Sequence, residues 1–126
     1  MHTTLDIDKT GLSLAELKQV RYGEIDRKTG GLIQSGFTFD SKVFSASPPA
    51  QFNWNSIKGN KPEFTFPLEI STLDNDTYNL TDVNVSTFWA SGRDHVKGHL
   101  DSGRALKKSI KDAVDIAAVN AIVDAR

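Results

Sequence analysis

The sequence predicts an α+β fold, with an N-terminal helix, a small antiparallel sheet of two hairpins, and a C-terminal helical segment of two to three helices. Three observations support this class. Apolar residues recur every three or four positions after Ser13 and again after Thr81, which is the period of a helix buried on one face. Between Glu63 and Thr72 they alternate with polar residues, as in a half-buried strand. The length of 126 residues suits one hydrophobic core.

A capping box predicts where the first helix begins. Ser13 and Glu16 have the three-residue spacing at which each side chain caps the backbone of the other. Apolar residues follow at helical intervals, and charged residues occupy the opposite face. We therefore expect a helix over residues 13–28, ended by the glycines at positions 30 and 31.

This helix gives the chain two expected parts. Residues 1–28 form a polar leader and an amphipathic helical arm, and residues 29–126 form the α+β domain. The arm either packs onto its own domain or docks onto a partner, and both readings stay open at this point. The arm residues that would contact a partner are Leu14, Leu17, Val20 and Arg21.

Two hairpins are expected to build the sheet. The first pairs residues 32–33 with residues 37–39 around a turn that contains a glycine. The second pairs residues 63–72 with residues 77–80. Pro67 cannot donate a hydrogen bond to a neighbouring strand, so the strand that contains it should lie at an edge or be bulged.

The segment between the hairpins is expected to be irregular. A short helix capped at Asp40 is predicted to stop at the two prolines of positions 48 and 49. Residues 49–62 are then predicted to form a loop that carries Phe52 and Trp54. These two rings either anchor the loop to the core or form an exposed recognition patch, so both are candidate partner-binding residues.

The chemistry-bearing side chains indicate neither an enzyme nor a cofactor. His95 and His99 are four residues apart on a predicted helix, a spacing that suits zinc, but the sequence offers no clear third ligand. We therefore predict no metal site and retain the two histidines as the only metal candidates. The chain has no cysteine, which excludes a thiolate nucleophile and a disulfide framework.

Charge and hydropathy argue against two classes of partner, nucleic acid and membrane. Fifteen basic and sixteen acidic side chains give a net charge of −1, whereas a protein that binds nucleic acid usually carries a basic excess. No stretch of the sequence is apolar over the length that a membrane span needs. We therefore expect neither nucleic acid nor membrane as a partner.

Several small, aromatic and apolar residues follow one another in an order that resembles the pattern of a known family. These residues are Arg21, Tyr22 and Glu24, then Gly30–Ile33 and Gly36–Ser41, and finally His95, Val96, Gly103, Leu106, Ile110 and Ala113. With Asn120–Ile122 at the end, the chain resembles, over about residues 20–122, a domain of unknown function found in bacteriophage tail and tail-fibre proteins. The middle departs from the family pattern, because Trp54 comes early and a strand begins at residue 64.

The resemblance implies a non-enzymatic virion protein, a structural or adaptor module associated with the tail fibre or the baseplate. It implies other phage tail proteins as partners, and synthesis in the cytoplasm of the host bacterium before incorporation into the particle. Repeated copies in a tail follow closed symmetry, so a homo-oligomer such as a trimer is expected. The alternative is a tail-fibre assembly chaperone that is not retained in the virion.

Overall fold

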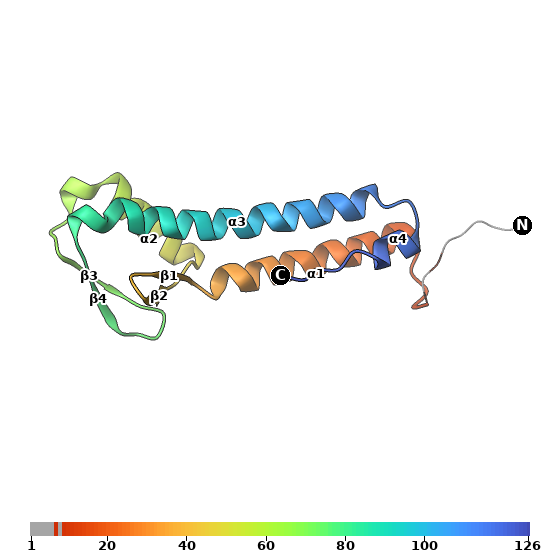
Figure 1. Cartoon of the computed structure of the whole chain (residues 1–126), viewed down its shortest axis with the longest axis horizontal. Helices are drawn as coiled ribbons and strands as arrows, with labels where there is room; N and C mark the ends of the chain where they lie inside the picture. Colours follow the sequence, from red (N-terminus) through yellow and green to blue (C-terminus); the bar gives the residue numbers. More distant parts are fainter. Residues whose placement is uncertain (1–6, 8) are drawn as a thin grey trace, which may run out of the picture. The chain divides into compact units, whose positions relative to one another are not determined.

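The computed structural model describes residue 7 and residues 9–126, and it has the predicted α+β class. Part of the expected leader, residues 1–6 and 8, therefore lies outside the described residues. The main elements follow one another in the order shown in Figure 1: α1 (Leu14–Gln34), β1 (Phe37–Phe39), β2 (Lys42–Phe44), α2 (Pro48–Gly59), β3 (Leu68–Ser71), β4 (Thr77–Leu80), α3 (Val85–Asp112) and α4 (Ile116–Asn120).

The chain forms two compact units. The terminal unit contains the described residues up to Gly30 together with Leu100–Arg126, and the central unit contains Gly31–His99. The contacts thus group most of the expected arm with the C-terminal residues. Whether the segment before residue 29 also docks onto a partner stays a prediction.

Helix α1 begins as the capping box predicts and ends later than expected. Ser13 N donates to Glu16 Oε1 at 3.1 Å, and Glu16 N donates to Ser13 Oγ at 3.2 Å. The predicted end at the two glycines is wrong, because Ile33, in the extra turn, packs against the core of the central unit. Such packing can offset the roughly 1 kcal/mol that each glycine costs inside a helix. The helix stops before Gly36, whose φ of +90° is a left-handed conformation that ends helices.

The terminal unit has a core of aliphatic side chains. Its buried members are Leu17, Ile25, Ile110, Ile116 and Val119. Basic side chains of α1 add hydrogen bonds around this core: Lys18 Nζ donates to the carbonyl oxygens of Lys111 at 2.8 Å and Ala113 at 2.7 Å. Carbonyl groups at a helix C-terminus lack partners within the helix, so Lys18 caps the end of α3.

The first hairpin differs from the predicted one. Residues 32–33 are helical, and β1 pairs with β2 instead, with Phe37 opposite Phe44. Asp40 and Ser41 have φ values of +50° and +61°, as the central residues of a two-residue type I′ turn require. The predicted short helix after Asp40 is therefore wrong, because this turn leads directly into β2.

The second hairpin confirms the predicted pairing and shortens the first strand. Strand β3 pairs antiparallel with β4, and Leu68 lies opposite Leu80. The alternating pattern that begins at Glu63 contributes to the ladder only after Pro67, which has no N–H to donate. Thr72 N donates to Asp76 O at 2.8 Å and closes the turn.

The predicted loop over residues 49–62 is mostly helix. Ser47 Oγ caps α2 by accepting from Ala50 N at 3.3 Å. Pro48 and Pro49 occupy the first turn, where an N–H would have no partner within the helix. The two prolines therefore begin a helix instead of ending one.

The C-terminal segment has two α-helices. This number lies within the predicted two to three: α3 is 28 residues long and α4 is five residues long. Asp115 Oδ1 caps α4 by accepting from Ala118 N at 2.7 Å. None of the helices in the described part of the chain combines the length and the apolar character needed to cross a membrane.

The core of the central unit is mainly aromatic. The rings of Phe37, Phe44 and Phe88 contact one another, and the Phe44 and Phe88 rings meet edge to face at 5.0 Å. Trp54 joins them from α2, edge to face with Phe37 at 6.0 Å. Ring pairs in such geometries add about 0.5–1.5 kcal/mol each beyond the burial of their area. This cluster holds the hairpins, α2 and the first turns of α3 in one unit.

Candidate binding pocket

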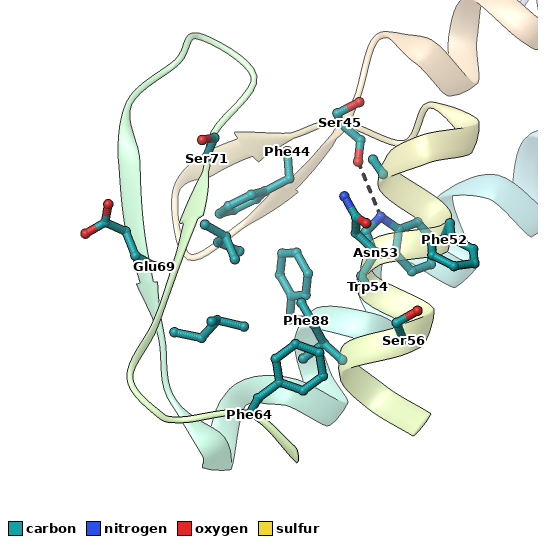
Figure 2. A pocket seen from close by; sticks show the side chains of 14 residues that line it. Phe44, Ser45, Phe52, Asn53, Trp54, Ser56, Phe64, Glu69, Ser71 and Phe88 are labelled. Carbon is teal, nitrogen blue, oxygen red and sulfur yellow. Dashed lines mark hydrogen bonds between the residues drawn. The ribbon is translucent and has the colours of Figure 1, made fainter. Parts of the chain in front are cut away.

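An open, largely apolar pocket of about 460 Å³ lies in the central unit (Figure 2). Pockets that bind small ligands usually measure about 300–1,000 Å³. Aromatic and aliphatic side chains line most of it, among them Phe44, Ile57, Phe64, Leu68, Ile70 and Phe88. Figure 2 shows the rings of Phe64 and Phe88 between β3 and α2.

Helix α2 forms one wall and places two aromatic residues differently. Trp54 is 6% exposed, and its Nε1 donates to Ser45 O at 3.4 Å, the dashed line in Figure 2. Phe52 also lines the pocket but is 72% exposed. Residues two apart on a helix point to nearly opposite faces, which explains the difference. Trp54 thus anchors α2 to the core, and Phe52 presents a ring to the outside.

Strand β3 forms the opposite wall through its edge. Leu68, Glu69, Ile70 and Ser71 all line the pocket, although successive side chains of a strand point to opposite faces of the sheet. A space beside the unpaired edge of a strand borders residues of both faces, as this lining does. The pocket is therefore bounded by the edge of β3 that does not pair with β4.

The two hairpins meet at one end of the pocket. Leu73 N, two residues beyond the end of β3, donates to Val43 O of β2 at 2.8 Å. The pocket lies between β3, the Phe44 end of β2 and α2 (Figure 2). This backbone hydrogen bond thus links the two hairpins beside the pocket.

Polar contacts fix the hairpin that carries β3. The hydroxyl of Tyr78 on β4 donates to Asp40 Oδ2 in the β1–β2 turn at 2.8 Å. Burial and then this hydrogen bond raise the pKa of Tyr78 above its usual value. The Thr72 hydroxyl donates to Asp74, and this bond lowers the pKa of the Asp74 carboxyl. Both contacts stabilise the β3–β4 hairpin, which forms one wall of the pocket.

The structure spreads the predicted partner-binding residues over both units. In the terminal unit, Leu17 is buried in the core, Leu14 packs against it, and Arg21 donates to the carbonyl oxygens of Val119 and Ile122. Val20 is 45% exposed. Of the predicted apolar residues, Val20 and Phe52 expose the largest fraction of their surface, and of these two Phe52 lines the pocket.

The two metal candidates form a ring contact. The ring centroids of His95 and His99 are 4.7 Å apart and the rings are nearly perpendicular. His95 Nε2 lies 2.9 Å from Ile33 O, so this nitrogen carries a proton and donates. Among the residues that the structure describes, no group of three or more His, Asp or Glu side chains is placed to hold a metal ion.

Sequence reasoning named Phe52 but missed the pocket beside it. The pocket requires α2 as a wall, and that segment reads as a loop when Pro48 and Pro49 are taken as terminators. The serine at position 47 was the available signal, because a serine followed by prolines is typical of a helix N-terminus.

Comparisons with protein-family models, curated proteins and solved structures find no match to this chain. The fold and the pocket are therefore described from this chain alone. The site that they define is an open apolar pocket with β3 on one side and the exposed ring of Phe52 on the other.

Proposed function

We propose that this chain is a non-enzymatic structural or adaptor protein of a bacteriophage tail, associated with the tail fibre or the baseplate. In this proposal it binds another tail protein through the pocket of its central unit. The resemblance over about residues 20–122 supports the phage context. The observation that carries the binding role is Phe52, an exposed aromatic ring at an open apolar pocket.

The chemistry of the pocket favours binding over catalysis. Its walls consist of aromatic and aliphatic groups with a few neutral polar residues, and Glu69 is the only ionisable residue that lines it. General acid–base catalysis commonly needs an acid and a base that converge on one substrate. Protein interfaces instead are rich in aromatic anchors surrounded by apolar contacts. A surface for another protein is therefore the function that this geometry supports best.

Mass spectrometry of purified particles tests the proposal. Tailed particles are prepared from a phage genome that encodes this chain, and the peptides of the particles are compared with those of the infected-cell lysate. We expect this chain in the particles at a constant ratio to a tail protein. If the chain is abundant in the lysate, co-purifies with a tail-fibre protein and is absent from particles, it is an assembly chaperone. If it associates with no tail protein in either sample, the proposal is wrong.

We also propose that the chain forms a closed homo-oligomer, such as a trimer, because proteins present in several copies in a tail follow closed symmetry. Native mass spectrometry and light scattering of the purified chain measure the copy number directly. A monomer at all concentrations would contradict this part of the proposal and leave the binding of another tail protein unaffected.

A further inference from the structure

We infer that the open edge of β3 accepts an extended segment of a partner protein as an additional β-strand, with apolar side chains in the pocket and basic side chains beside Glu69. The inference rests on the proposed function only in taking another protein as the partner. It specifies the backbone conformation and the side-chain pattern of the segment that binds.

The hydrogen-bonding pattern of the hairpin shows which groups of β3 face the pocket. In an antiparallel pair, opposed residues alternate between those that bond to each other and those whose N–H and C=O groups point outward. Thr72 N donates to Asp76 O, so the pair of Ile70 and Tyr78 also bonds across the hairpin. The N–H and C=O groups of Glu69 and Ser71 must therefore point away from β4, toward the pocket.

These outward groups are available. Leu73 N, the next outward group along the chain, donates to Val43 O. No hydrogen bond from another described residue reaches the backbone N–H or C=O groups of Glu69 and Ser71. A strand edge with unpaired amide groups is a template for a further strand. Such edges bind extended peptides through main-chain hydrogen bonds, and neighbouring pockets select alternate side chains.

The two faces of β3 determine which side chains the added strand should carry on each face. Leu68 and Ile70 pack against the aromatic core, and the rings of Phe64 and Phe88 lie beside them in the pocket. Figure 2 shows the Glu69 side chain directed away from the rings of Phe64 and Phe88. An added strand would therefore place apolar side chains on the ring side and its intervening side chains beside an exposed carboxylate. Because Glu69 is the only charged group of the lining, those intervening residues should be lysine or arginine.

A defined peptide tests the inference on the full chain. The probe is an acetylated, amidated heptapeptide of alternating isoleucine and lysine, and isothermal titration calorimetry measures its affinity. Two further peptides carry N-methyl groups either on all isoleucines or on all lysines. In an added strand only one set of N–H groups faces β3, so one methylated peptide should bind more than ten-fold more weakly and the other within about two-fold of the parent. Equal binding of both, or no binding of the parent peptide at millimolar concentration, would overturn the inference.

Variants of the chain test whether the peptide binds at the edge of β3 and whether Glu69 sets the preference for basic side chains. Ser71→Pro removes an N–H that faces the pocket and should abolish peptide binding. Asn79→Pro is the matched control, because Asn79 has the same outward orientation on the far edge of the hairpin. Glu69→Lys should reverse the preference, so that a peptide of alternating isoleucine and glutamate binds better than the lysine peptide. Glu63→Lys, outside the pocket lining, should leave the preference unchanged.

These results separate the inference from the proposed function. Circular dichroism of each variant establishes that it is folded before binding is measured. A chain that is found in particles and ignores the peptides contradicts strand addition alone. A chain that binds the peptides by this pattern and is absent from phage assembly contradicts the tail function alone.

Discussion

Gly103 of α3 lies directly against Thr29 of α1 in the terminal unit. A β-carbon at position 103 would come within 2.7 Å of Thr29 Oγ1. Thr29 Oγ1 donates to Ile25 O at 2.8 Å and accepts from Arg126 Nη1 at 2.8 Å. The hydroxyl cannot move away without losing these bonds, so the close approach of the two helices depends on a glycine at position 103.

We predict that Gly103→Ala destabilises the protein. Alanine normally stabilises a helix relative to glycine by about 0.5–1 kcal/mol, but overpacking at a close contact costs about 1–3 kcal/mol. Gly98→Ala is the matched control, because a β-carbon at position 98 of the same helix would meet no described heavy atom within 4 Å apart from its chain neighbours and the backbone of its own helix. Urea unfolding should show a lower free energy of unfolding for Gly103→Ala than for wild type, and no such decrease for Gly98→Ala. Equal stability of the two variants would show that the contact is not tight.

Arg126 holds the end of the chain in the same unit. Its guanidinium donates to Ile25 O at 3.2 Å, to Thr29 Oγ1 at 2.8 Å and to Asp124 Oδ2 at 2.7 Å. The hydrogen bonds from Arg126 are the main cause that lowers the pKa of the Asp124 carboxyl from 3.8 to about 2. The charged form of Asp124 is therefore favoured in the folded state.

We predict that this carboxylate makes the stability depend on pH between about 4 and 2. A carboxyl whose pKa is lower in the folded state stabilises the protein above its unfolded pKa, and that contribution is lost as the pH falls through the folded pKa. This lowering of the pKa corresponds to a contribution of at most about 2 kcal/mol to the free energy of unfolding at neutral pH. In urea unfolding, the free energy of unfolding of wild type should exceed that of Asp124→Asn. The difference should be constant above pH 5 and shrink toward pH 2. Asp112→Asn, at an exposed ion pair with Lys108, is the control and should change the stability little. A margin that does not vary with pH would contradict the assignment.

Two of the phenylalanines that line the pocket, Phe52 and Phe88, should differ in their effect on stability. We predict that Phe52→Ala leaves the free energy of unfolding within about 0.5 kcal/mol, as expected for an exposed position, whereas Phe88→Ala lowers it by about 3–5 kcal/mol. Phe88 is 4% exposed and contacts three other phenylalanine rings, whereas Phe52 is 72% exposed. Chemical denaturation measures both. A large loss for Phe52→Ala would mean that its ring is needed for the fold.

Local patterns in the sequence were enough to predict the fold class and several elements. The capping box at Ser13 placed the start of α1, and the alternation after Pro67 placed β3 against β4. In both cases the deciding interactions are between residues close in the chain. The errors occurred where distant contacts decide. The glycines of α1 do not end the helix because Ile33 packs against residues far along the chain.

The candidate site was predictable only in part, for a related reason. A helical period would have separated an exposed Phe52 from a buried Trp54, but the prolines that begin α2 were taken as a stop. The pocket depends on how the two hairpins are placed against each other, and the bond between Leu73 and Val43 that links them spans thirty positions of the chain. Arg126 likewise reaches Thr29 across 97 positions, which no local pattern encodes.

The most direct test of the account is a photocross-link from position 52 in assembled particles. A photoreactive benzoyl-phenylalanine replaces Phe52, and in a control it replaces Val114, which is 83% exposed and lies in the terminal unit. After irradiation of purified particles, mass spectrometry identifies the partners of each position. The account predicts that position 52 cross-links to another tail protein through an extended segment that contains lysine or arginine, and that position 114 does not reach that segment. Particles that contain the chain but give no cross-link from position 52 to another tail protein would contradict it.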